Sequence, residues 1–284
     1  MSKTNDHDML AIAQSCIAMA KSAGANDASA RAYRVRDVSL DFRDGKVERI
    51  SESTTRGVGI QLYVDSRFSS VSTSDLRPDA LKQFITDSIA LARSIQSDPF
   101  RALPDPALYK GQAAVDLQLE DPRYPDITAD DGRKAAKAMH DAARSVKGAD
   151  AILSVTASSS SNLIENWMVT SNGFSGANRS TAFFVSTQVS AKDADGRRPE
   201  EYAYAGSRYW NALADPGKIG ASAAQRTLNR LGSKKGETSA MTVIVDNRAA
   251  GRLAGMLAGP LSANALQQKR SFLDGKMDRR SSAR

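Results

Sequence analysis

The chain has 284 residues, of which 41% are hydrophobic and 25% charged, and its formal net charge is +7. This composition is that of an ordinary globular protein, and the length predicts two or three compact units. No apolar run approaches the roughly 18 to 20 residues that a membrane span needs. The polar start MSKTNDHDML also lacks the apolar core of a signal peptide, so we expect a cytoplasmic protein without a membrane partner.

The basic charge is concentrated at the end of the chain, which argues against a nucleic-acid interface. From Gln268 to Arg284, six basic residues stand against two aspartates, so this stretch carries +4 of the total charge. The sequence has no basic face interleaved with aromatic residues and no motif that reads nucleic acid. A nucleic-acid partner is therefore not expected.

Two helices are predicted to flank a set of strands in the first hundred residues. Apolar residues recur at helical spacing from Met9 to Ala20, and a second apolar stripe follows Pro78 and continues to Ile95. Cys16 is the only cysteine, so no intrachain disulfide can form. Its place on the first stripe favours a small buried side chain over a reactive thiol.

Between these helices, alternating apolar and polar residues predict an antiparallel β-meander with one buried face. Asp44 and Gly45 occupy the two central positions of a type I′ hairpin turn, which requires positive φ angles. We expect the polar stretch Ser51–Thr55 to separate two strands. The predicted strands are residues 38–42, 47–50, 58–64 and 68–73.

A proline-rich stretch from Pro99 to Gly111 predicts a linker, after which a second α+β unit begins. Thr128 and Asp131 have the spacing of a capping box at the start of a helix. The strands expected after it are 151–157, 167–170, 182–190 and 201–205, followed by a helix over 219–231, a strand over 241–245 and a helix from Ala249. We predict an α+β fold with domains at residues 1–112, 120–232 and 236–284.

Four segments resemble the TldD/PmbA family and occur in the family's order. They are Asp44-Gly45-Lys46-Val47-Glu48, Arg56-Gly57-Val58-Gly59-Ile60, Thr170-Ser171-Asn172-Gly173-Phe174, and Val243-Ile244-Val245 with the helix that follows. The resemblance extends from about Asp27 to Lys276. It marks Asp44, Gly45, Arg56, Gly57, Gly59, Asn172 and Gly173 as structural motif positions.

The resemblance implies a function through one helix, Arg252-Leu253-Ala254-Gly255-Met256-Leu257-Ala258-Gly259. In this family a TldD-type subunit carries a zinc-protease HExxxH helix, and a TldE (PmbA)-type subunit lacks that motif while completing a heterodimeric protease. Ala254 and Gly259 stand where the two histidines would be, and Gly255 stands where the glutamate would be. None of these side chains can bind zinc or act as a base.

The composition also argues against hydrolysis by this chain. His7 and His140 are the only histidines, so no HExxH-like spacing exists and a serine triad is poorly supported. The resemblance therefore implies a chain with no catalytic and no metal-binding residues, whose partner is a TldD-type subunit that holds the zinc. The implied substrate is a peptide or an unfolded polypeptide.

The end of the sequence leaves an alternative open. Family members continue well beyond Lys276, whereas this sequence ends in the polar tail Asp278 to Arg284. We therefore expect a fragment whose third domain is truncated at its C-terminal side. The alternative to a protease subunit is a truncated, non-functional product, or a scaffold or interaction module without a protease role.

Overall fold

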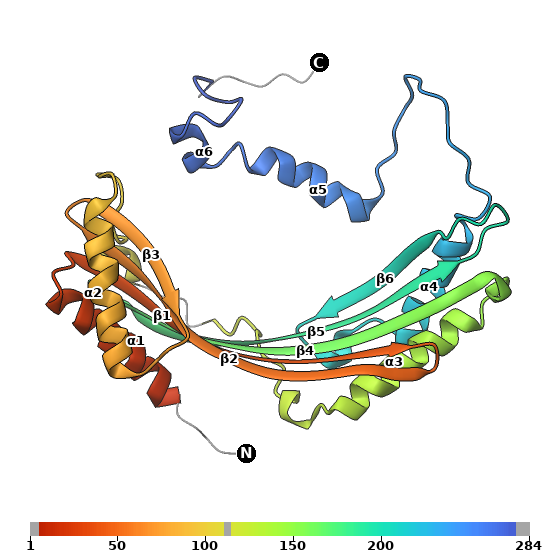
Figure 1. The fold of residues 1–284 in the computed structure, drawn as a ribbon, viewed down its shortest axis with the longest axis horizontal. Helices are drawn as coiled ribbons and strands as arrows, with labels where there is room; N and C mark the ends of the chain where they lie inside the picture. The colour runs from red at the N-terminus through yellow and green to blue at the C-terminus, as the bar shows by residue number, and fades with distance from the viewer. Residues whose placement is uncertain (1–5, 111–114, 277–284) are drawn as a thin grey trace. The chain divides into compact units, whose positions relative to one another are not determined.

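The computed structural model describes residues 6–110 and 115–276, and the chain divides into two compact units, residues 1–233 and 234–284. The larger unit is built on a six-stranded antiparallel sheet with the strand order β3-β2-β1-β4-β5-β6 (Figure 1). Helices pack against this sheet. The predicted α+β class and the antiparallel meander are thereby confirmed.

The described helices and strands follow one another in this order. The larger unit contains α1 (Asp6–Ser22), β1 (Asp27–Arg43), β2 (Lys46–Val64), β3 (Arg67–Thr73), α2 (Pro78–Ser94), α3 (Ala129–Arg144), β4 (Ile152–Thr170), β5 (Ser175–Ala191), β6 (Glu200–Ser207) and α4 (Pro216–Leu228). Short 3-10 helices lie at Pro106–Tyr109, Tyr124–Asp126, Ala149–Ala151 and Trp210–Ala212. The smaller unit contains α5 (Asn247–Ala258) and α6 (Ala263–Gln267).

Two strands are longer than the sequence predicted. The polar stretch Ser51–Thr55 does not separate two strands, because β2 continues through it and pairs with β1 throughout. The serine run Ser158–Ser161 likewise lies inside β4. Strand pairing satisfies the backbone hydrogen bonds regardless of the side chains. All five side chains of Ser51–Thr55 are exposed, so no position in that stretch needs an apolar residue.

Strands from both sides of the predicted linker belong to one sheet, because β1 pairs with β4 from Ser29–Thr170 to Arg43–Thr156. The domain boundaries predicted within residues 1–232 stay a prediction. What the sheet does establish is that β1 and β4 form its centre, with β3 and β6 as the outermost strands.

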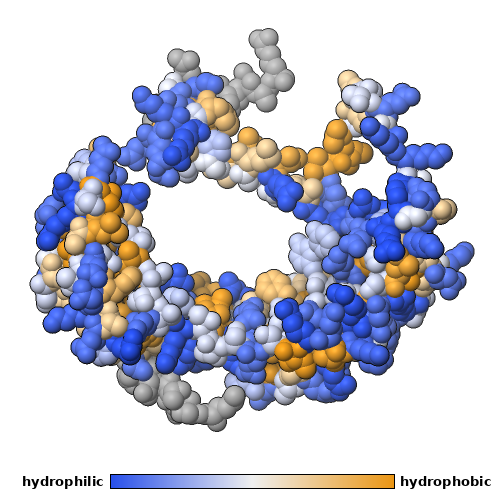
Figure 2. All heavy atoms as spheres, viewed as in Figure 1, coloured by the Kyte–Doolittle hydropathy of each residue, from blue (hydrophilic) through white to orange (hydrophobic). Residues whose placement is uncertain are grey.

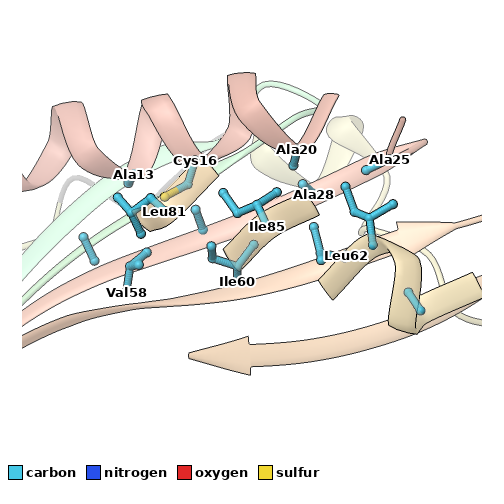
Figure 3. Packing of buried hydrophobic residues seen from close by; sticks show 14 of the residues in the cluster. Ala13, Cys16, Ala20, Ala25, Ala28, Val58, Ile60, Leu62, Leu81 and Ile85 are labelled. Atoms are coloured by element: carbon cyan, nitrogen blue, oxygen red, sulfur yellow. The ribbon is translucent and has the colours of Figure 1, made fainter. Parts of the chain in front are cut away.

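One core cluster fills the space between α1, α2 and the first three strands (Figure 3). Cys16 of α1 is fully buried there, beside residues such as Ile60 of β2 and Ile85 of α2. Burial raises the pKa of the Cys16 thiol to about 11. The prediction of a small buried side chain at this position is confirmed, since a thiol with that pKa carries almost no thiolate near neutral pH.

The helices α3 and α4 cover the other end of the sheet. Phe42 and Val185 pack beneath Met139 of α3, and Ala223 of α4 joins a neighbouring cluster with Val155. The predicted capping box is present at the start of α3, where Thr128 and Asp131 bond to each other's backbone N–H groups. The two helices also contact each other closely at Gly220, which is buried.

The smaller unit differs from the sequence prediction at residues 241–245, which do not form a strand. A strand needs a neighbouring strand to accept its backbone hydrogen bonds, and the described part of this unit contains only helices and loops. Its apolar residues are largely exposed, as the orange surface near α5 in Figure 2 shows; Ile244, for example, is 93% exposed. Residues 277–284 of the predicted basic tail lie outside the described residues.

None of the helices in the described part of the chain is long and apolar enough to cross a membrane.

Candidate functional site

Asp44 and Gly45 form the turn between β1 and β2, with φ angles of 45° and 87°. Both values are positive, as a type I′ turn requires, and the prediction is confirmed. The Asp44 carboxylate also reaches outside the turn. It accepts hydrogen bonds from Arg144 Nη2 (2.6 Å), Ser154 Oγ (2.8 Å) and the backbone N–H of Val155 (3.0 Å). This aspartate therefore joins the hairpin to α3 and β4.

At Gly57 the neighbouring atoms leave no room for a side chain. A Cβ atom at Gly57 would lie 2.6 Å from Tyr33 Oη and 2.9 Å from the backbone oxygen of Thr73. Glycine is therefore needed there so that the Tyr33 ring can lie across β2. At Gly59 a Cβ atom would meet nothing within 4 Å, and Arg56 is exposed.

Asn172 and Gly173 belong to the turn between β4 and β5, where Gly173 has a φ of 105°. Asn172 Nδ2 donates to the carbonyl of Pro104 (2.8 Å), and Asn172 Oδ1 accepts from the hydroxyls of Thr170 (2.7 Å) and Tyr109 (3.1 Å). The turn thus anchors the segment that leads away from α2.

These motif positions do not meet in one site. The Asp44 turn lies at the end of β1, whereas Ser171 next to Asn172 bonds to Ala28 at its beginning. Since a strand rises about 3.3 Å per residue, the 17 residues of β1 run roughly 50 Å along the strand between the two turns. The hydrogen bonds of Asp44 and Asn172 connect strands, a helix and a linker, so both residues have a structural role.

The positions aligned with the zinc-protease motif lie on and just after α5. Ala254 and Gly255 are helical, and Gly259 is the C-cap residue. All three are exposed, and a Cβ atom added at Gly255 would meet nothing within 4 Å. A methyl group and two hydrogens supply no electron pair for a metal, so the residues present do not fit a zinc site.

No group of three or more His, Cys, Asp or Glu side chains that could hold a metal ion occurs in the part of the chain that the structure describes. His140 is held against the sheet: its Nδ1 lies 3.1 Å from Asp141 Oδ1, and its ring meets the Phe42 ring at 5.4 Å. The side chain of His7 lies outside the described residues.

Known proteins resemble this chain along most of its length. Residues 28–92 match the model described as PmbA/TldA metallopeptidase domain 1, and residues 122–231 match the PmbA/TldA metallopeptidase central domain. The metalloprotease PmbA of Escherichia coli O157:H7 is 30% identical over 259 residues, which is 90% of this chain and 55% of that protein. The chain belongs to the PmbA/TldD family. A PmbA homologue from Haemophilus influenzae is 26% identical, over 95% of this chain and 59% of that protein.

Two solved structures of similar proteins share the fold of this chain. A crystal structure of a candidate modulator of DNA gyrase from Bacteroides thetaiotaomicron is 32% identical with a TM-score of 0.87, covering 97% of this chain and 61% of that one. TldE from Thermococcus kodakarensis has a TM-score of 0.72 at 15% identity, covering 93% and 58%, and shows likeness of fold alone. The chain thus spans 55% to 61% of the lengths of these PmbA/TldD proteins.

One buried ionic group of this PmbA/TldD chain was not predicted from its sequence. The Glu165 side chain is only 3% exposed, and its carboxylate bonds to Arg34 through Nε (2.5 Å) and Nη2 (2.9 Å). Arg179 Nε lies 3.5 Å from the same carboxylate and Arg179 Nη2 lies 3.2 Å from Glu120. The sequence did carry a signal for this group. Glu165 stands two positions before Trp167, so in a strand both side chains lie on the same face.

Asp44 provides a pH-dependent test of the hairpin anchor. Partial burial acts to raise the pKa of its carboxyl, but the bonds from Val155, Ser154 and Arg144 outweigh burial and lower this pKa below its ordinary value. We expect Asp44→Asn, which keeps a residue that tolerates positive φ, to lower the free energy of unfolding by about 1 to 2 kcal/mol at neutral pH.

A group with a lowered folded-state pKa contributes stability above its unfolded pKa of about 3.9 and loses it as the pH falls through the folded value. The difference between wild type and Asp44→Asn should therefore be constant from pH 7 to about 5 and shrink below about pH 4. Urea unfolding followed by circular dichroism at each pH measures it. A difference that does not change with pH would contradict the anchoring role of the charge.

Proposed function

We propose that this chain is a TldE-type, non-catalytic subunit of a two-subunit zinc metalloprotease that acts on peptides or unfolded polypeptides. The observation that carries the proposal is α5, where Ala254, Gly255 and Gly259 occupy the positions aligned with the family's two histidines and glutamate. Family membership supports the link to proteolysis. The non-catalytic role is supported by α5, whose residues at the aligned positions have no side-chain atom that can bind a metal. Zinc, an activated water and a general base come from the TldD-type partner.

The proposal predicts that proteolysis depends on the partner. The purified chain is incubated with unfolded casein alone, with a TldD-type subunit, and with both the subunit and a chelator, while zinc is measured by mass spectrometry. We expect no stoichiometric zinc and no hydrolysis for the chain alone. Chelator-sensitive hydrolysis is expected once the TldD-type subunit is added, because only that subunit supplies the metal ligands.

A helix-breaking variant, Gly255→Pro, distinguishes activity of this chain from a contaminating protease. Chelator-sensitive hydrolysis by the isolated wild-type chain that disappears in Gly255→Pro would overturn the non-catalytic assignment. One tightly bound zinc ion per wild-type chain would overturn it as well. Hydrolysis that is equal in both preparations comes from a contaminant and is removed by further purification before the comparison is made.

A further inference from the structure

The free edge of β5 is covered along only part of its length. The strand β6 pairs with β5 from Phe183 to Ser190. Just beyond this pairing, the backbone N–H of Thr181 donates to the carbonyl of Leu119 at 3.0 Å, so this N–H points away from β4. The β4–β5 register has no shift between Ser154 and Val169, and in an antiparallel pair every second residue has the same orientation. The N–H and C=O groups of Arg179 and Ala177 therefore also point outward.

These outward groups border an open cavity. In the part of the chain that the structure describes, neither Ala177 nor Arg179 has a backbone partner on its outward side. Beside them lies a cavity of about 920 Å³, which residues 115–120 also line. Its size is near the upper end of ordinary ligand pockets, which leaves room for a short stretch of polypeptide. The unpaired edge and the cavity together form one groove, which we call the β5 groove.

The side chains of the β5 groove favour an apolar segment over an anionic ligand, since the lining holds Asp116 and Glu120 against one arginine. Val115 and Leu117 on its wall are 67% and 68% exposed, and Trp167 and Tyr209 also line it. The one arginine in the lining, Arg179, already lies 3.2 Å from Glu120 and 3.5 Å from Glu165. Its charge is therefore balanced within the chain, so an anion gains little by entering.

We infer that the β5 groove accepts one extended segment of a partner polypeptide, which adds to the sheet beside Ala177 and Arg179. Alternating outward N–H and C=O groups are matched by another extended backbone, and strand addition is a common mode of polypeptide recognition. The segment places an apolar side chain at every second position, toward Val115 and Leu117, and polar side chains on its other face. The groove belongs to residues 1–233 alone, so the inference does not rest on the proposed protease role.

Binding is tested with a fluorescein-labelled octapeptide that alternates valine with glutamine, measured by fluorescence anisotropy against the full chain. We expect saturable binding. Ala177→Pro should weaken it at least tenfold, because proline removes an outward N–H and is tolerated at strand edges. Leu117→Ser should also weaken binding, whereas Leu108→Ser, a matched control at a leucine that is 74% exposed outside the lining, should leave it unchanged.

Two further peptides keep the test decisive if Ala177→Pro fails to fold. One is N-methylated at the valines and the other at the glutamines, so that each loses the N–H groups of one side of the strand. Strand addition predicts that one of them binds at least tenfold more weakly than the other. Absence of saturable binding, equal binding by the two methylated peptides, or unchanged binding by a folded Ala177→Pro chain would overturn the inference.

Discussion

Gly220→Ala is expected to destabilise the larger unit by about 3 kcal/mol or more, because an added Cβ atom comes closer to other atoms there than at any other glycine that the structure describes. Gly220 lies on α4 where that helix meets α3. A Cβ atom there would lie 1.9 Å from the carbonyl oxygen of Met139 and 2.7 Å from its carbonyl carbon. These are backbone atoms of α3, so the clash is relieved only if the two helices move apart, which opens the core around Met139.

Urea unfolding of Gly220→Ala, followed by circular dichroism, measures this effect. The matched control is Gly59→Ala, because a Cβ atom at Gly59 meets nothing within 4 Å and its φ is not in the left-handed region. We expect the control to stay within about 0.5 kcal/mol of the wild type. Equal stabilities for Gly220→Ala and Gly59→Ala would show that α3 and α4 do not approach each other at Met139.

Glu165→Leu is expected to lower the free energy of unfolding by about 2 to 4 kcal/mol. The substitution removes a buried carboxylate that bonds to Arg34 at two atoms and lies 3.5 Å from Arg179, so two guanidinium groups lose a common counter-charge. This expected loss of free energy of unfolding is smaller than the loss for a fully buried ion pair, because the side chains of Arg34 and Arg179 are 25% and 45% exposed.

A surface pair in the same sheet provides the control. Glu52 bonds to Arg36 at 2.7 Å, but the Glu52 side chain is 57% exposed, so Glu52→Leu should change stability by less than about 1 kcal/mol. The double variant Arg34→Met/Glu165→Leu should regain part of the loss, since it removes both partners of the most buried pair and leaves Arg179 beside Glu120 at 3.2 Å. A loss for Glu165→Leu no larger than that for Glu52→Leu would contradict the buried ionic group.

The local elements of this chain could largely be predicted from its sequence. The turn at Asp44-Gly45, the capping box at Thr128 and the buried stripe that includes Cys16 all depend on residues within one turn or one helix. Such interactions are short in sequence and have clear residue preferences. The family motifs and the donor-free helix at Gly255 could also be read directly, because they depend only on residue type and spacing.

Strand lengths and the missing strand at residues 241–245 could not be predicted in the same way. The stretch Ser51–Thr55 lacks strand-like alternation, yet it is held in β2 by backbone pairing with β1. Residues 241–245 have the β-branched composition of a strand, yet the described part of their unit offers no strand to pair with. Pairing partners are supplied by the rest of the fold, so local pattern alone cannot decide either case.

The sequence by itself determined the α+β class, the main turns and helices, and the family to which the chain belongs, because each follows from residue type and spacing. Only the tertiary structure decided which distant residues meet. Glu165 lies 131 positions from Arg34, and Gly220 lies far along the chain from Met139, so no local sequence pattern predicts either contact. The β5 groove likewise arises from where β6 ends beside β5, since strand edges become free or covered only when the whole sheet is assembled.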